Sequence, residues 1–397
     1  MKLVLRKLSM SDILFFMSFT LYFCLSFLST TFYYQYFTGG IYRIGLILSI
    51  LIALIREMII SKYSVKSILG AAVTVIFALV IMSATTMLNV VALSIILIYC
   101  FRNIEFSRVA YLSLFMSIIL LLFVIISSKL GIIMNYLEMT SGGRARYYLG
   151  FRYSLFAPSA MVNIISVWLF LKKEKIKYFT LFLLFLCNYW IFTQTNSRLT
   201  FYTGCGLVIF ALLYKLCPNF LQKLKKILSL FSLTYFVGAF ISYQIAIKYN
   251  TFNRSFVWLN ERLGNRIYLA HTSLQKYGFK LFGQQISWQG NGLDAQGKYT
   301  TTSYLYVDNM YVQMLQRYGV VLLVTFLIAA TWVLIRLYRS NELFLFIIMV
   351  VLGFHALIDD LILYSYFNSF WFIFAMLMTK DYQLYTPPKE NLLNFEL

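Results

Sequence analysis

Apolar runs about as long as a bilayer is thick recur along the whole sequence. A helix needs roughly 20 predominantly apolar residues to cross about 30 Å of hydrocarbon. The composition agrees with this pattern, because 61% of the 397 residues are hydrophobic and 12% are charged. The sequence therefore predicts an all-α polytopic membrane protein.

We expect about 12 transmembrane helices within a single integral membrane domain, 1–397. The basic start of the chain leads into an apolar stretch that is too long for a removable signal peptide, so this stretch counts as the first helix. The second and fourth segments are short. The expected segments are residues 12–34, 41–55, 67–86, 88–101, 109–128, 154–171, 179–195, 199–214, 227–247, 318–335, 343–358 and 361–379.

Lys and Arg recur in alternate connections between these segments, which fits the positive-inside rule. We therefore expect both termini in the cytoplasm. The basic residues on that side would be Lys2, Arg6, Lys7, Arg56, Lys62, Lys66, Arg102, Arg108, Lys172, Lys173, Lys175, Lys177, Lys215, Lys223, Lys225, Lys226, Arg336, Arg339, Lys380 and Lys389.

Two connections on the opposite side are long, and both are basic. They span residues 129–153 and 248–317, and the second is the large extracytoplasmic loop. Basic residues that only orient helices belong in the cytoplasm, so an excess outside predicts an anionic ligand or anionic lipid headgroups there. Nucleic acid is not expected as a partner across a membrane.

The first outer loop contains "SGGRARYYLGFRYS", in which Arg144, Arg146 and Arg152 stand among glycines and tyrosines. Glycine lets a backbone approach a ligand closely, and arginine offers two parallel donors to a phosphate. These arginines are therefore candidate substrate-binding residues. The alternative is an ordinary solvated loop with a few charges.

In the second outer loop, residues 260–279 have the spacing of an amphipathic helix. Arg262 and Arg266 would share one face of it, with His271 nearby and Arg254 preceding the segment. All four are candidate substrate-binding residues. A surface histidine and two arginines on one helix face are also common without any function.

The turn "TNSR" separates two apolar segments and places Arg198 at the membrane surface. An arginine there can snorkel without a further role, or it can face a polar cavity. His355 stands one turn before Asp359, which predicts a structural hydrogen bond between them. The five cysteines lack the spacing of a metal site and are expected in the core.

Asp308 and Asn309 come immediately before an apolar run that starts at Met310. A carboxylate at this place can cap a helix by accepting hydrogen bonds from the free amides of the first turn. The other interpretation is that Asp308 is a catalytic base held at the membrane surface.

The order of these features resembles the oligosaccharide repeat-unit polymerases of the Wzy type, which share a superfamily with the O-antigen ligases. The common elements are a basic Gly/Tyr outer loop, an Asn-Ser-Arg turn, a large outer loop with Arg and "LFG", and "DN" before an apolar helix with "RYG". The resemblance covers the architecture of the whole chain and implies a fold like that of class C glycosyltransferases. Where the family commonly has Gly-x-Gly after "LFG", this chain reads "GQQ".

The resemblance implies that repeat units on undecaprenyl pyrophosphate are joined into a surface polysaccharide on the outer face of the bacterial cytoplasmic membrane. Arg198 and Arg266 would bind the donor pyrophosphate with Arg262 beside them, and Asp308 would activate the acceptor hydroxyl, with Asn309 next to it. Donor and acceptor would both be lipid-linked oligosaccharides. No metal or other cofactor is expected, the anomeric configuration would invert, and a flippase and a chain-length regulator are implied as partners.

Two alternatives stay open. A ligase-type transferase would move finished glycan to another acceptor, but ligases usually have His where Asp308 stands. A flippase for lipid-linked oligosaccharides would also have about 12 helices, yet transporters commonly contain internal repeats with sites at the midplane. This chain shows no repeat between its halves, and its polar groups gather at one surface, which favours an enzyme.

The asymmetry of Lys and Arg predicts the side on which each connection lies. Alkaline phosphatase fused after Gln289 should be active, because this enzyme folds only outside the cytoplasm, and a fusion after Asn219 should be inactive. The reverse pattern of activities would invert the proposed topology.

Overall fold

The computed structural model describes residues 9–60, 65–85, 88–139, 143–298, 304–379 and 382–385. Most of these residues are helical, and the sheet among them is a two-stranded antiparallel hairpin. Several basic residues of the expected cytoplasmic side lie outside the described residues, namely Lys2, Arg6, Lys7, Lys62, Lys380 and Lys389, together with the side chain of Lys66.

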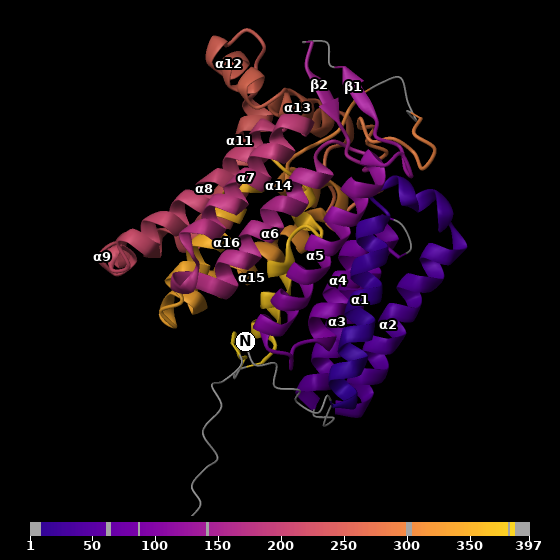
Figure 1. The fold of residues 1–397 in the computed structure, drawn as a ribbon, viewed down its shortest axis with the longest axis vertical. Coiled ribbons are helices and arrows are strands. Elements are labelled where there is room, and N and C mark those ends of the chain that lie inside the picture. The colour runs from indigo at the N-terminus through magenta and orange to yellow at the C-terminus, as the bar shows by residue number, and fades with distance from the viewer. Residues whose placement is uncertain are drawn as a thin grey trace, which may run out of the picture.

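The first half of the chain is built from long helices joined by short turns, with one hairpin (Figure 1). Its elements are α1 (Met10–Leu28), α2 (Gly40–Ile60), α3 (Val65–Ala84), α4 (Val90–Cys100), α5 (Phe106–Lys129), β1 (Leu137–Met139), β2 (Ala145–Tyr147), α6 (Phe156–Lys172), α7 (Tyr178–Thr195) and α8 (Arg198–Leu216). Short 3-10 helices are at Phe32–Tyr36 and Lys173–Lys175.

The second half contains more short elements. They are α9 (Phe220–Lys223), α10 (Lys225–Leu228), α11 (Thr234–Lys248), α12 (Arg254–Arg262), α13 (Arg266–Tyr277), α14 (Met310–Gln313), a π-helical turn (Met314–Tyr318), α15 (Gly319–Arg339) and α16 (Leu343–His355). Further 3-10 helices are at Ser229–Leu233, Leu361–Leu363 and Ser369–Leu377.

Six helical stretches in the described ranges are long and apolar enough to cross a membrane, and α4 and α16 are shorter apolar helices. The six are Met10–Leu28, Ser67–Ala84, Phe106–Lys129, Arg198–Leu216, Lys225–Lys248 and Val320–Arg339. A mostly helical, multi-pass membrane protein is therefore indicated. The count of about 12 spans stays a prediction, because residues 361–379 form 3-10 turns and α4 has only 11 residues.

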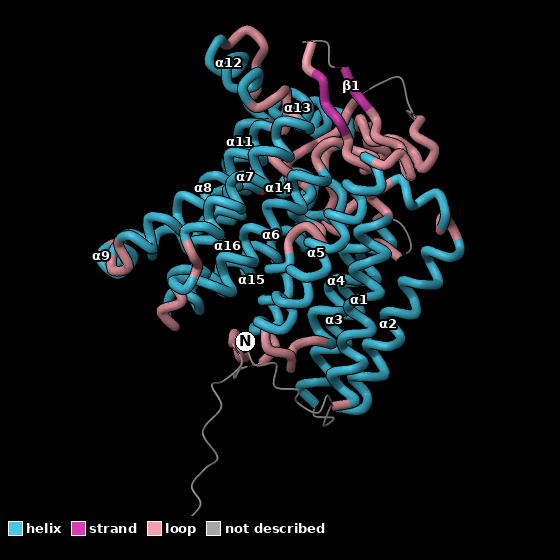
Figure 2. The backbone as a smooth tube through the Cα atoms, in the orientation of Figure 1, coloured by secondary structure: helices cyan, strands magenta, loops and turns pink. Residues whose placement is uncertain are grey.

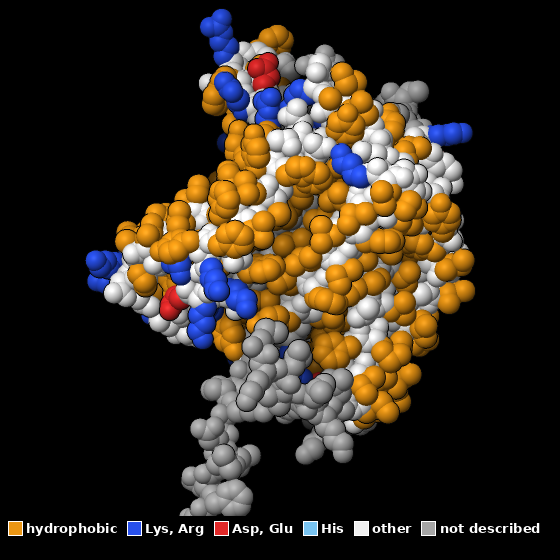
Figure 3. Space-filling model, viewed as in Figure 1, with side chains coloured by type: hydrophobic (Ala, Val, Ile, Leu, Met, Phe, Trp, Pro, Cys, Tyr) orange, Lys and Arg blue, Asp and Glu red, His pale blue; other side chains and the backbone are white. Residues whose placement is uncertain are grey.

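The surface separates into an apolar zone and charged ends. Hydrophobic side chains cover the middle of the face in Figure 3, while Lys and Arg gather over α12 at one end and around α9 toward the other side. Such a band is what the hydrocarbon core of a bilayer would contact, because exposed apolar patches of this size are rare on soluble monomers. The cysteine prediction holds only for buried Cys100, since Cys187 and Cys217 are exposed.

The two long connections lie at the same end of the molecule. Figures 1 and 2 show the β1–β2 hairpin, α12, α13 and most of the irregular chain together beyond the ends of α5, α6, α8 and α11. Irregular segments concentrate where the backbone can be hydrogen-bonded by water or by other loops. This end is therefore where the chain can build a polar site.

The turn between α7 and α8 consists of Asn196 and Ser197. Asn196 adopts a left-handed conformation, with φ of 51°, which asparagine tolerates better than most residues. Ser197 then precedes the first residue of α8, Arg198, and does not cap the helix with its side chain. The "TNSR" motif thus reverses the chain in two residues and places Arg198 at the open N-terminus of a long helix.

The prediction of one amphipathic helix over residues 260–279 is wrong. It is broken into α12 and α13 because Gly264 and Asn265 both have a φ of 65°, and two consecutive left-handed residues end a right-handed helix. Arg262 therefore ends α12, and Arg266 begins α13. They no longer share one helix face, but the bend directs both toward one cavity.

The glycines of "LFG" and "RYG" meet in space. Gly283 and Gly319 have φ of 85° and 92°, and a Cβ atom on either one would overlap the backbone of the other segment. The amides of Val320 and Val321 donate to the carbonyls of Lys280 and Leu281, at 3.2 and 3.1 Å. This contact fixes the large outer loop to the start of α15, where the π-helical turn ends.

Candidate active site

A polar cavity of about 600 Å³ opens among the loops at this end. Its walls come from the β1–β2 hairpin, the α7–α8 turn, the α12–α13 bend and the segment before α14. We call it the anion cavity. Six of the predicted site residues line it: Arg144, Arg146, Arg198, Arg262, Arg266 and Asp308.

Arg266 and Asp308 form an ion pair at the wall of the anion cavity. An Nη2–Oδ2 distance of 3.7 Å separates them, and both side chains are largely buried. Arg266 also donates from Nη1 to the carbonyl of Leu263, at 3.0 Å. Arg266 Nε and Asp308 Oδ1 are buried without a hydrogen-bond partner among the described residues. The pair therefore retains one donor and one acceptor that a bound molecule could use.

Burial raises the pKa of the Asp308 carboxyl, and the charges of Arg266 and Arg146 act in the opposite direction. A carboxylate with a raised pKa takes up a proton more readily than one in water. Only 5% of Asp308 is exposed, so its carboxylate has little contact with water, which is the reason that burial raises its pKa. The Asp308 carboxylate is therefore a better proton acceptor than a carboxylate in water.

Arg146 joins the hairpin to the α7–α8 turn. Its Nε donates to the carbonyl of Thr195 at 3.1 Å, and its Nη2 lies 3.5 Å from Ser197 Oγ. Across the hairpin, Glu138 pairs with Arg146 in the strand register, and their side chains approach to 3.6 Å. Arg146 thus holds the turn that carries Arg198.

Arg198 and Arg262 are exposed to the anion cavity, and neither has an ion-pair partner in the described part of the chain. The guanidinium of Arg262 lies 5.6 Å from the ring centroid of Trp258, which orients it without neutralising it. Arg198 adds its charge to the uncapped N-terminus of α8, which already carries a partial positive charge. Both are therefore available to an anion.

Of the two interpretations of Asp308, the helix cap is wrong. The N-cap is Asn309, whose Oδ1 accepts from the amide of Val312 at 3.1 Å. Its Nδ2 donates to Ser242 Oγ and to the carbonyl of Leu357, at 3.0 and 2.8 Å. Asn309 is thus fully used in holding α14, and Asp308 is left to face Arg266.

Three other predicted residues lie outside the anion cavity. Arg152 donates to the carbonyls of Ser29 and Leu293, at 2.6 and 3.4 Å, so it ties the two outer loops to the end of α1. His271 bonds through Nδ1 to the carbonyl of Ala246, at 2.8 Å. Arg254 begins α12 away from the cavity. The structure gives none of them a direct part in the site.

A buried acid that sequence reasoning did not place in the site lies beneath it. Asp360 Oδ2 accepts hydrogen bonds from the Tyr306 hydroxyl at 2.7 Å and from Gln313 Nε2 at 2.8 Å. Burial and the neighbouring charges of Asp308 and Asp359 raise the pKa of Asp360 well above its usual range. The signal in the sequence was the pair of adjacent acids at the end of an apolar run, a position where an ionisable group needs partners.

The hydrogen bond predicted between His355 and Asp359 is present, at 3.1 Å. Asp359 also accepts from Ser159 Oγ at 3.1 Å and from the amide of Leu361 at 2.9 Å. Burial alone would raise the pKa of Asp359, but the hydrogen bonds from His355 and Leu361 bring it below its usual value. Asp359 is therefore an ionised structural group that joins α16 to α6.

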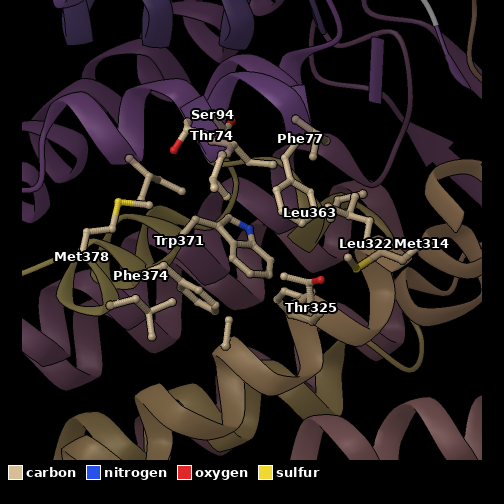
Figure 4. Close-up of a pocket in the computed structure, with 17 residues that line it drawn as sticks. Thr74, Phe77, Ser94, Met314, Leu322, Thr325, Leu363, Trp371, Phe374 and Met378 are labelled. Carbon is tan, nitrogen blue, oxygen red and sulfur yellow. The ribbon is translucent and has the colours of Figure 1, made fainter. Parts of the chain in front are cut away.

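A separate apolar cavity of about 250 Å³ lies among α3, α4, α15 and the 3-10 helix Ser369–Leu377. Figure 4 shows the Trp371 indole in its middle, surrounded by aliphatic and aromatic side chains. Its hydroxyls are occupied, since Thr74, Ser94 and Thr325 each donate to a carbonyl one turn earlier in their own helix. This cavity suits hydrocarbon and offers no group for chemistry.

The neighbours Asp359 and Asp360 should respond differently to substitution. Asp360→Asn should raise the free energy of unfolding at pH 7, because the raised pKa of the wild-type carboxyl disfavours folding at that pH and an amide carries no such cost. Asp359→Asn should cost about 2–4 kcal/mol, because it leaves buried donors unpaired. Thermal unfolding of the purified protein would measure both.

The pH dependence of the same unfolding gives a second check. The raised pKa of Asp360 contributes stability that is present at low pH and lost as the pH rises through its folded value, and Asp360→Asn should remove this loss. The lowered pKa of Asp359 contributes stability at neutral pH that disappears as the pH falls through its folded value. Equal effects of the two substitutions at pH 7 would contradict the assigned protonation states.

In the described ranges, no group of three or more His, Cys, Asp or Glu side chains is arranged to hold a metal ion. Comparison of the chain with known protein families, with characterised proteins and with solved structures found no match. A function for the anion cavity must therefore be inferred from its own geometry and chemistry.

Proposed function

We propose that this protein is a glycosyltransferase that polymerises polyprenyl-pyrophosphate-linked oligosaccharide repeats on the outer face of a bacterial cytoplasmic membrane. One observation carries the proposal. Five arginines from three separate segments line the same cavity as a single buried carboxylate, Asp308, whose Oδ1 has no hydrogen-bond partner among the described residues. Anion binding and proton removal can thus occur side by side.

The arginine side of the cavity suits a pyrophosphate. Guanidinium groups bind phosphate oxygens through two parallel hydrogen bonds, and Arg198 and Arg262 form no ion pair in the described chain, although Glu261 lines the same cavity. Arg266 has an unused Nε, and the N-terminus of α8 adds its dipole. As the bond from the anomeric carbon to the phosphate oxygen breaks, negative charge grows on the pyrophosphate, and these fixed donors stabilise it.

The carboxylate side suits the acceptor. Asp308 would take the proton of an acceptor hydroxyl while that oxygen attacks the anomeric carbon of the donor sugar. The new glycosidic bond forms as the bond to pyrophosphate breaks, and the lipid pyrophosphate leaves with the electron pair. Because attack and departure occur on opposite faces of the sugar, the anomeric configuration inverts. The proton passes to Asp308 and later to water.

The location of the cavity favours this chemistry over transport. It lies among the loops at one end of the molecule, whereas a transporter places its site between helices near the bilayer midplane. A substrate that is anchored by a lipid keeps its phosphates at the headgroup level. The anion cavity would receive them there, with the termini and α9 on the cytoplasmic side, and a flippase and a chain-length regulator would work beside the enzyme.

The fork of donors on arginine should be essential for the pyrophosphate. Arg198→Lys and Arg266→Lys keep the charge but lose the paired donors, so we expect polymer synthesis to fall at least about tenfold in each. Arg254→Lys is the matched control, because Arg254 lies outside the cavity. Gel laddering of polymer from equally expressed variants would report this, and wild-type chain lengths in both variants would remove the two proposed roles.

Removal of the base should slow the reaction itself. Asp308→Asn keeps the shape of the side chain but cannot accept the proton, and we expect a loss of about 10²- to 10⁴-fold in the rate of polymerisation of a purified lipid-linked repeat. Asp294→Asn, in the same loop but outside the cavity, should be harmless.

The alternative role of Asp308 is only to neutralise Arg266. Asp308→Asn would then lower thermal stability and leave the rate per folded molecule within a few-fold of the wild type. The two roles are separated by measuring the rate, pyrophosphate binding and unfolding temperature on the same preparation.

A further inference from the structure

A cavity distinct from the apolar one around Trp371 adjoins the anion cavity and has different lining groups. It measures about 370 Å³, which is within the range of about 300–1,000 Å³ that is usual for small-molecule sites. Tyr153 and Asn291 line both cavities, so the two share a wall. We call the second one the aromatic cavity. Its other principal residues are Trp288, Gln289, Tyr306 and Asp360.

The aromatic wall is held in place without a ligand. The indole N–H of Trp288 donates to Ser273 Oγ at 2.8 Å, and Ser273 in turn donates to Gln316 Oε1 at 2.8 Å. The guanidinium of Arg317 lies 5.1 Å from the Trp288 ring centroid. The ring of Tyr306 packs against the Trp288 ring, with 6.2 Å between the two centroids. Trp288 is therefore a half-buried ring whose polar atom is already satisfied.

The polar groups of the aromatic cavity are neutral or acidic. No Lys or Arg lines it in the described part of the chain, in contrast to the anion cavity. Asp360 accepts from the Tyr306 hydroxyl, Asn291 Nδ2 donates to Glu138 Oε1 at 3.4 Å, and the amide of Gln289 also lines the cavity. A phosphate has no cation to bind here. An uncharged ring with many hydroxyls could use the amides as partners and place its C–H face on an aromatic ring.

We propose that the aromatic cavity binds a saccharide ring of the lipid-linked substrate, immediately next to the pyrophosphate held in the anion cavity. This inference rests on the proposed function and identifies where the sugar lies. The shared wall of Tyr153 and Asn291 is where the ring and the phosphate would meet, which is also the place of the bond that breaks.

The glycines of "QGNG" allow a clean test. A Cβ atom at Gly292 would meet nothing within 4 Å, and its φ is not in the left-handed region, so a larger side chain can be added without strain. Gly292 lines the aromatic cavity. Gly292→Leu should therefore fill the cavity while the fold is retained. Trp288→Phe is a milder change, which leaves an aromatic ring of smaller area and removes the indole N–H.

Two probes report on the two cavities separately. One is the repeat-unit oligosaccharide of the source cell, released from its lipid pyrophosphate by mild acid, and the other is inorganic pyrophosphate. Their binding to the full-length protein in nanodiscs is measured by calorimetry. Gly292→Leu should weaken oligosaccharide binding at least about tenfold and leave pyrophosphate binding within about twofold. Trp288→Phe should weaken oligosaccharide binding less, and Arg198→Gln should affect only pyrophosphate.

The control is Phe252→Ala, an aromatic residue on the same end that is 95% exposed and lines neither cavity. It should bind both probes as the wild type does. Equal oligosaccharide binding by the wild type and Gly292→Leu, or none by a wild type that binds pyrophosphate, would overturn the inference alone. Absence of pyrophosphate binding, with normal oligosaccharide binding that Gly292→Leu abolishes, would overturn the proposed function and leave the saccharide site standing.

The same variant shows which sugar occupies the cavity. The released oligosaccharide has no leaving group, so it can serve only as an acceptor in an assay with lipid-linked donor. If the acceptor sugar binds here, Gly292→Leu raises the KM for the free oligosaccharide and leaves the KM for the donor unchanged. If the donor sugar binds here, the KM for the donor rises. An unchanged KM for both would contradict the proposal.

Discussion

The ion pair between Arg266 and Asp308 connects the start of α13 with the segment before α14, and the anion cavity is built around it. A buried pair of this kind is costly to desolvate, and the Coulomb attraction repays that cost only when the remaining atoms are also bonded. Here they are not, since Arg266 Nε and Asp308 Oδ1 have no hydrogen-bond partner among the described residues. Hydrophobic residues of similar volume would hold the two segments at least as well, so a ligand-binding role accounts better for the pair than stability does.

Local features of the site could be predicted from the sequence, and features that depend on distant contacts could not. The hydrogen bond between His355 and Asp359 follows from a spacing of four residues on a helix. The helix break at Gly264 and Asn265 had a local signal in the Gly-Asn pair, but the periodic spacing of apolar residues on both sides concealed it. Asp308 and Asn309 are about equally good N-caps, and the choice depends on Arg266, which lies far away in the sequence. Asp360 is buried only because Tyr306 and Gln313 are brought to it by the fold.

The anchoring of the large outer loop gives the site its rigidity. Gly283 and Gly319 allow two backbones to meet where a side chain on either would prevent it, and the carbonyls of Lys280 and Leu281 accept the amides that begin α15. Gln316, in the π-helical turn, donates to the carbonyls of Ser273 and Gly278, both at 3.0 Å. A loop of this length would otherwise move independently of the helices. Trp288 is hydrogen-bonded to Ser273 of α13, and Asp308 is paired with Arg266 of the same helix, so both are held in a constant relation.

The two adjoining cavities divide the polar groups by charge. All the arginines that line the two cavities lie on the anion side of Tyr153 and Asn291, whereas the described lining of the aromatic cavity includes no Lys or Arg. If Asp360 also lined the anion cavity, it could pair with a second arginine, as Asp308 does with Arg266, and leave fewer arginines for a ligand. Separation keeps Asp360 away from Arg198 and Arg262, and burial and its acidic neighbours raise the pKa of Asp360, which favours its uncharged form. The raised pKa of Asp360 favours its neutral form and so reduces the negative charge beside the anion cavity, which links the hydrogen-bond network of Tyr306 and Gln313 to the electrostatics of the site.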